Sequence, residues 1–243
     1  AAEDLKLVGC FDPHCAGQVV SCADGDFACS DDLGALIDAT GADVVVDFTQ
    51  PGAVLANVEC VLSHGAHAVV GTTGVARQDM EALALKYADK GGKLFFAPNF
   101  TTGAVLMMQF AKVAGKFFPD VEIVEMHHDG KKDAPSGTAV TTAHMIAEGR
   151  GGVRNAGPGS ETEIAGCEGA RGAEVDGVRI HAIRGDGYMA SQEVIMSAAG
   201  QTLTIRHDST LREAYMPGVL LEIRNVASLP EPFTVGLECL MGL

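Results

Sequence analysis

The sequence predicts an α/β protein: a Rossmann-like doubly wound parallel sheet, N-terminally incomplete, followed by an α+β domain with a mixed sheet. Two observations predict this fold class. Apolar, β-branched runs alternate with helix-patterned segments over residues 1–101, which is the order of a parallel sheet covered by helices. Beyond residue 101 a long helix leads to strands that alternate apolar and polar residues, as antiparallel strands with one exposed face do.

In the first domain we expect four strands, at Leu5–Phe11, Asp43–Phe48, His67–Gly71 and Lys93–Ala97. The run at 43–48 is typical of a parallel strand buried on both faces. Helices are predicted after Asp32, a typical N-cap residue, and from Pro51 to Gly65, because proline suits a helix start and glycine a helix end. A third helix is predicted around Met80.

In the second half we expect a helix whose inward face is Leu106, Phe110, Val113 and Phe117. A strand at Val121–Met126 and a helix ending near Glu148 follow. Residues 149–172 have little pattern and are expected to form a long loop, either a lid or a disordered segment. Antiparallel-type strands are predicted at Val178–Ile183, Glu193–Ser197 and Thr202–Arg206, then a helix from Pro217 and a strand near Thr234–Glu238 that returns to the first sheet.

These elements predict three segments: residues 1–101 as a dinucleotide-binding domain, 102–212 as a substrate-binding and oligomerisation domain, and 213–243 as the return to the first domain. A net charge of −15 argues against nucleic acid, which requires a basic surface. No run of 18 apolar residues and no signal-peptide pattern is present, so we expect a cytoplasmic protein without a membrane span. Seven cysteines without a C-x-x-C pair predict reduced thiols rather than a metal site.

Three strand ends carry residues suited to a cofactor, because ligands of open parallel sheets bind at the carboxyl ends of the strands. Asp12 ends the first predicted strand, in the position of an acid that accepts hydrogen bonds from the adenosine ribose. The predicted strand at His67–Gly71 ends in small and hydroxyl residues, Gly71, Thr72 and Thr73, where we expect a nicotinamide. The predicted strand at Lys93–Ala97 ends in Ala97, Pro98, Asn99 and Phe100. Each group alone is also ordinary turn chemistry, but together they favour a cofactor groove.

The glycine fingerprint of such folds, G-x-G-x-x-G, is not found before Asp12. It would stand about 20 residues ahead of the ribose acid, whereas eleven residues precede Asp12. The first strand and its phosphate loop are therefore not expected within this chain.

The most informative segment runs from Glu125 to Ala139. Although the protein is acidic, the six residues 127–132 include four side chains that can carry positive charge: His127, His128, Lys131 and Lys132. The chain then passes through Pro-Ser-Gly-Thr into a helix, and the amides at a helix start bind anions. We expect a carboxylate site there, supported by Lys131 and the Thr138 hydroxyl. The alternative is a solvated loop with Ser136 as an ordinary N-cap. A zinc site is not expected, because adjacent histidines point to opposite sides of a strand and no third ligand is evident.

These residues resemble those of the dihydrodipicolinate reductase family of lysine and diaminopimelate biosynthesis. The similarity runs through residues 46–51, 70–74, 97–100, 169–172 and 204–209, and is most specific in the HHDGKKDAPSGTA segment. The resemblance implies hydride transfer from NADH or NADPH to the ring double bond that is conjugated to the imine of a cyclic dicarboxylate. It also implies a homotetramer.

Position by position, the resemblance implies that His127 is the acid/base residue and Lys131 the proton donor. The substrate carboxylates are expected at His128, Ser136, Gly137 and Thr138. Gly71–Thr73 and Ala97–Phe100 are expected to border the nicotinamide, and Asp12 the ribose. This chemistry suits the residues: a fixed ammonium stabilises the charge left by hydride addition, and an imidazole that titrates near neutral pH is a suitable proton donor.

Two alternatives stay open: another Rossmann-type NAD(P)-dependent dehydrogenase, and a non-catalytic truncated remnant, which the absent phosphate loop favours. The cofactor preference also stays open. Asp12 favours the 2′-hydroxyl of NADH, whereas nearby His14 favours the 2′-phosphate of NADPH. Asp129 is expected to weaken anion binding slightly, because it adds a carboxylate beside the cations.

Overall fold

The computed structural model describes residues 2–152, 164–167 and 169–243, and the chain divides into two compact units. Unit 1 comprises Ala1–Pro98 and Val219–Met241, and unit 2 comprises Asn99–Gly218 and Gly242–Leu243. The predicted segment boundaries lie within a few residues of these divisions; the roles assigned to the segments stay predictions. Much of the long loop expected at 149–172 lies outside the described residues.

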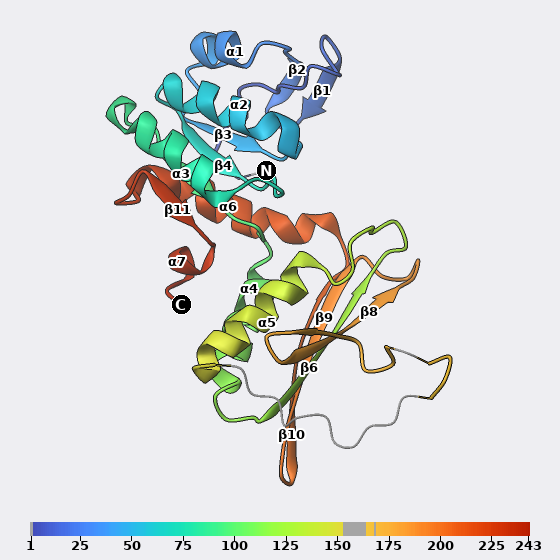
Figure 1. Cartoon of the computed structure of the whole chain (residues 1–243). Coiled ribbons are helices and arrows are strands. Elements are labelled where there is room, and N and C mark those ends of the chain that lie inside the picture. Colours follow the sequence, from blue (N-terminus) through green and yellow to red (C-terminus); the bar gives the residue numbers. More distant parts are fainter. Residues whose placement is uncertain (1, 153–163, 168) are drawn as a thin grey trace. The chain divides into compact units, whose positions relative to one another are not determined.

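Unit 1 is built on a parallel four-stranded sheet with the order β11-β5-β4-β3 (Figure 1). The strands are β3 (Val44–Asp47), β4 (His67–Val70), β5 (Leu94–Phe96) and β11 (Phe233–Val235). β11 pairs in parallel with β5, which confirms the return of the chain to the first sheet. The α/β class with its parallel sheet is therefore confirmed.

The helical segments of unit 1 begin and end largely where local chemistry predicts. Asp32 caps α1 (Leu33–Thr40) by accepting a hydrogen bond of 2.9 Å from the Ala35 amide. Pro51 opens α2 (Pro51–Ser63), and Gly65, with φ of 77°, follows its end. The other helices are α3 (Arg77–Lys86), η1 (Ala88–Lys90), α6 (Met216–Asn225), η3 (Val226–Ser228) and α7 (Glu238–Met241). The fully buried side chains of α2 include Val54 and Leu62, which pack in the core with Leu94 of β5.

The first predicted strand, Leu5–Phe11, does not form. One side of this segment bonds to residues 24–30, with a Phe11–Ser30 bridge and a 2.9 Å hydrogen bond from the Ser30 amide to the Cys10 carbonyl. Between Phe11 and Ser30 the chain forms a hairpin that was not predicted, with strands β1 (Val19–Cys22) and β2 (Gly25–Ala28). A strand requires a hydrogen-bonded partner, and the segment has only this isolated bridge.

A cavity of about 1390 Å³ is lined by residues 5–11 and by β3. Apolar side chains of α1, α2 and α6 also line it, including Leu36, Val61 and Ile223. Among the described residues β3 pairs only with β4. The prediction that β3 is buried on both faces is therefore wrong in part, since Val44, Val45 and Val46 are half-buried.

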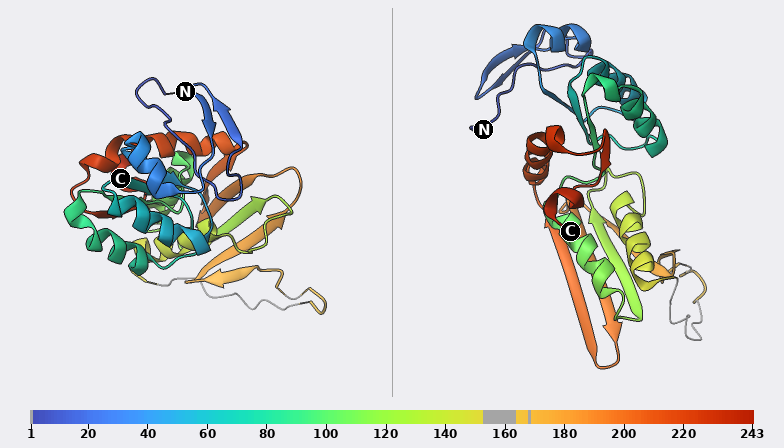
Figure 2. Two further views of the ribbon diagram at one scale, coloured as in Figure 1. Left: turned by 90° about the horizontal axis from the view of Figure 1, so that it is seen from above. Right: turned by 90° about the vertical axis from the view of Figure 1, so that its left-hand side faces the viewer.

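Unit 2 is built on a five-stranded sheet with the order β10-β9-β6-β8-β7, and its mixed character confirms the predicted class (Figures 1 and 2). Its strands are β6 (Asp120–His127), β7 (Ala173–Val175), β8 (Val178–Arg184), β9 (Ala190–Ala198) and β10 (Gln201–Ser209). β9 and β10 form a long antiparallel hairpin, whereas β8 runs parallel to β6. The two longer helices are α4 (Thr102–Ala114) and α5 (Gly137–Arg150), and η2 (Arg212–Tyr215) precedes α6.

The predicted inward face of α4 is wrong. Phe110, Val113 and Phe117 are exposed, Phe117 to 75%. The buried residues of α4 are smaller or unbranched: Ala104, Val105, Met107, Met108 and Ala111.

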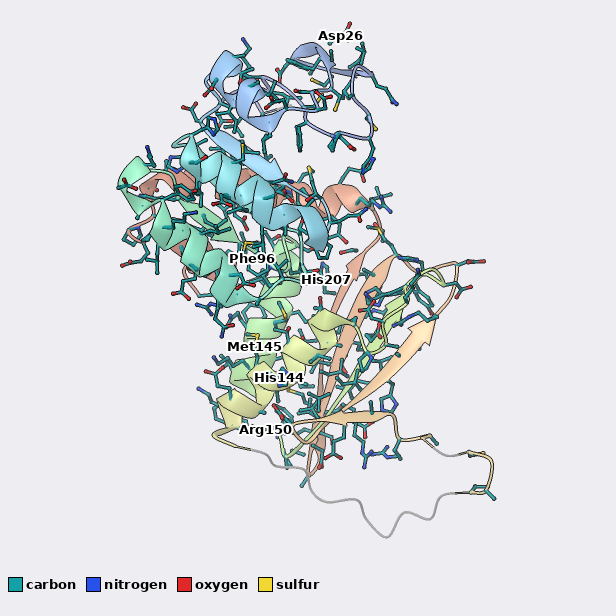
Figure 3. The ribbon with its side chains drawn as sticks, turned by 45° about the horizontal axis from the view of Figure 1, so that its top comes forward. Asp26, Phe96, His144, Met145, Arg150 and His207 are labelled. Atoms are coloured by element: carbon teal, nitrogen blue, oxygen red, sulfur yellow. The ribbon has the colours of Figure 1, made fainter. Side chains whose placement is uncertain are left out.

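Close packing of α4 on α5 explains this choice of face. A Cβ on Gly149 would overlap the carbonyl oxygen of Lys112, so the two helices touch backbone to backbone. Arg150, labelled in Figure 3, donates hydrogen bonds to the carbonyls of Gly115 and Phe118 just beyond α4. Close approach favours the small face of α4 and leaves the aromatic face outside.

Candidate functional site

The segment that follows β6 carries most of the predicted site residues of unit 2. His127 is the last residue of β6, and a turn closed by a 3.1 Å hydrogen bond from the Lys131 amide to the His128 carbonyl follows. Because side chains alternate along a strand, Glu125 and His127 lie on the same side of β6. His128 is exposed, and its ring lies against Gly130.

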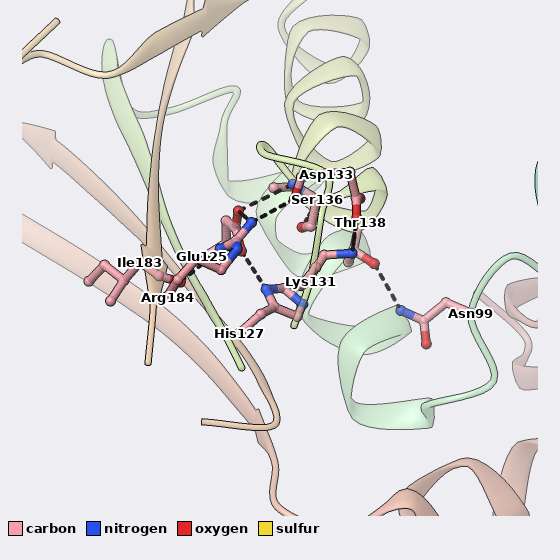
Figure 4. Close-up of polar contacts among 10 residues, drawn as sticks. Asn99, Glu125, His127, Lys131, Asp133, Ser136, Thr138, Ile183 and Arg184 are labelled. Atoms are coloured by element: carbon pink, nitrogen blue, oxygen red, sulfur yellow. Dashed lines mark hydrogen bonds and ion pairs between the residues drawn. The ribbon is translucent and has the colours of Figure 1, made fainter. Parts of the chain in front are cut away.

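Glu125 is the centre of this segment, although its side chain is fully buried (Figure 4). It accepts a short hydrogen bond from His127 Nδ1 and one of 3.2 Å from the Ser136 amide. Arg184, at the end of β8, donates to both Glu125 oxygens at 2.8 and 3.0 Å. Arg184 also donates 2.8 Å to the Asp133 carbonyl. One buried carboxylate thus connects β6, β8 and the start of α5.

This contact sets the state of the His127 ring. A carboxylate only accepts hydrogen bonds, so Nδ1 carries the proton and Nε2 is the free ring nitrogen. Burial lowers the pKa of His127; Lys131 and Arg184 lower it further, and Glu125 opposes them. A lowered pKa favours the neutral imidazole at neutral pH, in which Nε2 is an acceptor. The acid/base role expected for His127 stays a prediction.

Lys131 lies beside His127 in Figure 4 and brings a positively charged ammonium group to the segment. Its Nζ donates to both oxygens of Asp133 at 2.8 and 2.9 Å. The hydrogen bond from Lys131 lowers the pKa of Asp133, which stays ionised. Sequence reasoning assigned the nearby carboxylate to Asp129, but Asp133 makes the ion pair. Such a partly exposed pair contributes only about 0–1 kcal/mol, so an anionic ligand can replace it.

The start of α5 offers backbone donors. Ser136, which is buried, caps the helix by accepting a 3.2 Å hydrogen bond from the Ala139 amide. The backbone amides of Gly137 and Thr138 donate no hydrogen bond to any of the described residues. A Cβ on Gly137 would meet nothing within 4 Å, so this turn is open to a ligand. The Thr138 hydroxyl accepts a long hydrogen bond, 3.4 Å, from the Asn99 amide.

The predicted cofactor residues of unit 1 lie at the ends of its strands. The Thr72 hydroxyl is buried and donates 2.7 Å to Asp47 at the end of β3, while Thr73 is exposed. Asp47 also accepts from the amide of Thr49 and the side chain of Asn57. Thr72 therefore joins two strand ends instead of presenting its hydroxyl to a ligand.

The other predicted cofactor residues differ in exposure. Asp12 is exposed and accepts a 2.8 Å hydrogen bond from the His14 amide. Gly71 donates its amide 2.9 Å to the Asp47 carbonyl. Ala97 is buried and Pro98 exposed. Asn99 and the buried Phe100 belong to unit 2, where Asn99 accepts a 2.9 Å hydrogen bond from the Thr101 amide.

Sequence reasoning missed three polar residues of the site in unit 2: Glu125, Asp133 and Arg184. The spacing of Glu125 and His127 on one strand was a usable signal. No local sequence pattern indicates Arg184, because it comes next to His127 only when β8 pairs with β6. Within the described residues no cluster of three or more histidine, cysteine or acidic side chains is arranged for a metal ion, and no described helix is long and apolar enough to cross a membrane.

Two protein families match most of the chain. Residues 1–100 match the family "Dihydrodipicolinate reductase, N-terminus", and residues 103–240 match "Dihydrodipicolinate reductase, C-terminus". The 4-hydroxy-tetrahydrodipicolinate reductase of Thermobifida fusca is 52% identical over 83% of this chain and 82% of its own length. That of Listeria welshimeri is 47% identical over 97% and 90%.

Solved structures agree as well. A dipicolinate-bound dihydrodipicolinate reductase from Paenisporosarcina sp. TG-14 is 38% identical and covers 98% of this chain and 90% of its own, with a TM-score of 0.83. An amine dehydrogenase from Mycobacterium smegmatis shares the fold at 15% identity, covering 94% of this chain and 87% of its own, with a TM-score of 0.58. The chain belongs to the dihydrodipicolinate reductase family.

Proposed function

We propose that this protein is a 4-hydroxy-tetrahydrodipicolinate reductase of lysine and diaminopimelate biosynthesis. The observation that carries the proposal is the arrangement after β6: a cationic Lys131 beside a neutral His127, followed by two open amides at the start of α5. The names of the relatives at 47 and 52% identity support it.

A dicarboxylate substrate is proposed to bind at the start of α5. The Gly137 and Thr138 amides and the Thr138 hydroxyl would receive one carboxylate, because a helix N-terminus presents both donors and positive potential. The Lys131 ammonium would give up its ion pair with Asp133 and contact the ring of the dicarboxylate substrate. Ser136 is proposed to act through its cap, which fixes these amides, and exposed His128 would meet the outer part of the substrate.

The bound nicotinamide cofactor would supply the hydride. Lys131 is proposed to stabilise the negative charge that hydride addition spreads over the neighbouring carbon and the imine nitrogen, and to give its Nζ proton to that carbon. His127 Nε2, an acceptor in the neutral ring, is proposed to receive a hydrogen bond from Lys131 once the ammonium has left Asp133, and to restore the ammonium after turnover by passing on a solvent proton. Catalysis therefore requires neutral His127 and protonated Lys131.

The strand ends of unit 1 fit a nicotinamide cofactor in part. Gly71, which has no side chain, and the exposed Thr73 follow β4, and the small, buried Ala97 follows β5, at the carboxyl ends of strands where such ligands bind. Exposed Asp12 is a suitable acceptor for ribose hydroxyls. We propose NADH or NADPH as the cofactor, and the test therefore uses both.

An exposed apolar stripe on α4 and in the turn just beyond it supports the proposal of a homotetramer. Phe110, Val113 and Phe117 form an apolar face that solvent would otherwise cover. Phe117→Lys is expected to lower the mass seen by analytical ultracentrifugation; an unchanged mass would move the interface elsewhere. A cytoplasmic location is proposed because all seven cysteines are free thiols.

One assay tests the activity. Oxidation of NADH and of NADPH is followed by absorbance with freshly made substrate, using the chain and a version extended at its N-terminus by an apolar strand and a glycine-rich turn. Turnover by either version supports the reductase, and turnover by neither removes it. The open edge of β3 favours one competing function, a carboxylate-binding protein without turnover; that function predicts dipicolinate binding by both versions and oxidation by neither.

A further inference from the structure

Glu125 and Arg184 lie behind the reactive side chains rather than among them. Figure 4 shows Glu125 between His127 and Arg184, with the start of α5 alongside. The Glu125 carboxylate is fully buried, and its hydrogen bonds come from the His127 ring, the Ser136 amide and Arg184. A buried carboxylate is costly unless it is paired and hydrogen-bonded, and here every donor belongs to the site segment or to the adjacent end of β8.

We propose that Glu125 and Arg184 form a positioning pair that holds His127 with Nδ1–H inward and Nε2 free for the substrate and Lys131. This inference deepens the proposed function and rests on it for the catalytic consequence. Glu125 fixes the ring by accepting from Nδ1. Arg184 fixes Glu125 by binding both of its oxygens, and fixes the following loop through the Asp133 carbonyl.

A second cluster of the same composition on the same strand supplies a matched control. Glu122 accepts hydrogen bonds from His181 Nε2, at 2.7 Å, and from Arg171. Glu122 and Glu125 are three residues apart, so they lie on opposite faces of β6. The Glu122 side chain is 32% exposed, whereas that of Glu125 is fully buried. Both carboxylates hold a histidine and an arginine, but only Glu125 holds the histidine that lies beside Lys131.

The two members of the pair act on His127 with opposite electrical sign. Burial is the largest cause of its lowered pKa; Glu125 raises the pKa, and Lys131 and Arg184 lower it. Glu125→Gln removes an anion, so the pKa of His127 falls further. Arg184→Met removes a cation, so the pKa rises. The charged groups that act on this ring are Glu125 from β6, Arg184 from β8, and Lys131 from the turn, with Asp133 paired to Lys131.

These opposite shifts separate positioning from a merely structural role. Since turnover requires neutral His127, activity falls as pH drops through the pKa of that ring. The acid limb of the kcat profile is expected to move to lower pH in Glu125→Gln and to higher pH in Arg184→Met. General loss of structure would lower activity in both variants without moving the limbs apart.

The decisive experiment measures the protonation state and tautomer of the His127 ring by ¹⁵N NMR in the full chain, and kcat and KM as functions of pH. In the unmodified chain we expect a neutral ring protonated on Nδ1. In Glu125→Gln we expect that tautomer to lose its dominance and kcat to fall about 10²–10⁴-fold, with a much smaller change in KM. Glu122→Gln should leave the His127 spectrum and kcat unchanged.

The spectrum decides the inference even where a variant does not fold, because the unmodified chain alone must show Nδ1–H. A neutral ring protonated on Nε2 would overturn the positioning pair. Acid limbs of the kcat profile that shift in the same direction in Glu125→Gln and Arg184→Met would also overturn the positioning pair. Absence of turnover in the unmodified chain would instead count against the proposed function, and leave the tautomer measurement valid.

Discussion

The segment from Glu125 to Thr138 in unit 2 and the edge of β3 in unit 1 differ sharply in how their polar groups are used. In the segment, Glu125, Lys131 and Ser136 have partners within a few residues or across one strand pair. Along the edge of β3, residues 44–46 face a cavity, although their β-branched side chains are typical of a central strand. The proposed carboxylate site is therefore preorganised within unit 2, whereas the parallel sheet of unit 1 has an unpaired edge at β3.

The largest effect is expected from removing the charge that the preorganised segment supports. Lys131→Ala should lower kcat about 10²–10⁴-fold, because the ammonium stabilises charge that is present only during reaction. Cofactor affinity, measured by fluorescence titration, should stay nearly unchanged. Lys132→Ala is the matched control, since Lys132 is an exposed neighbour. Equal losses in the two variants would show that general charge, and not the position of Lys131, drives turnover.

The open edge predicts a gain rather than a loss. Fusing an apolar strand and a glycine-rich turn ahead of Ala1 should protect the amides of Val44 and Val46 from hydrogen exchange, because these two amides face the unpaired edge of β3 and an added strand would accept their hydrogen bonds. NADH should then bind about tenfold tighter or better, a gain of about 1.4 kcal/mol. A scrambled, charged sequence of the same length is the control. Equal protection by both fusions would mean that the cavity does not select a strand.

Both regions show where sequence reasoning succeeds and where it stops. Local signals placed the helix starts at Asp32 and Pro51, because caps and proline act within one turn. The prediction at Leu5–Phe11 was wrong because an apolar run becomes a strand only with a partner. Hydrophobicity also misjudged the inward face of α4, since close contact at Gly149 selects small residues. The Glu125–Arg184 pair joins residues 59 apart, which only the strand register brings together.

A smaller effect is expected from a buried acid of unit 1. Glu222 is fully buried, and no partner of its carboxyl oxygens is found among the described residues; burial raises its pKa to about 9 from the ordinary 4.5. The folded state therefore keeps a proton that the unfolded state loses above pH 4.5, so this contribution to stability is present at low pH and is lost as pH rises toward 9.

The matched variants are Glu222→Gln, which cannot ionise, and Glu231→Gln, which is exposed. Between pH 5 and pH 8 the unmodified chain should lose more stability than Glu222→Gln, by up to about 4 kcal/mol, measured by urea unfolding. Glu231→Gln should follow the unmodified chain. Parallel pH dependence of all three proteins would show that Glu222 is hydrated or paired in solution.

The smallest effect tests the cap that fixes the open amides. Ser136→Ala removes the acceptor of the Ala139 amide and should cost about 0.5–2 kcal/mol of stability. The affinity for dipicolinate should fall only modestly, because the proposed contacts to the ligand are the amides, while the Ser136 hydroxyl accepts from the Ala139 amide. Thermal unfolding and calorimetric titration check the two parts. A loss of binding as large as that of Lys131→Ala would place the Ser136 hydroxyl in direct contact with the ligand.

The central claim is that the start of α5 and Lys131 form a pocket for a dicarboxylate on an acidic protein. Titration of the chain with dipicolinate, followed by amide NMR, tests it most directly. The Gly137 and Thr138 amides should show the largest chemical-shift changes, and Lys131→Ala should weaken the binding markedly. Binding that leaves these two amides unchanged, or that is the same in Lys131→Ala, would contradict the claim.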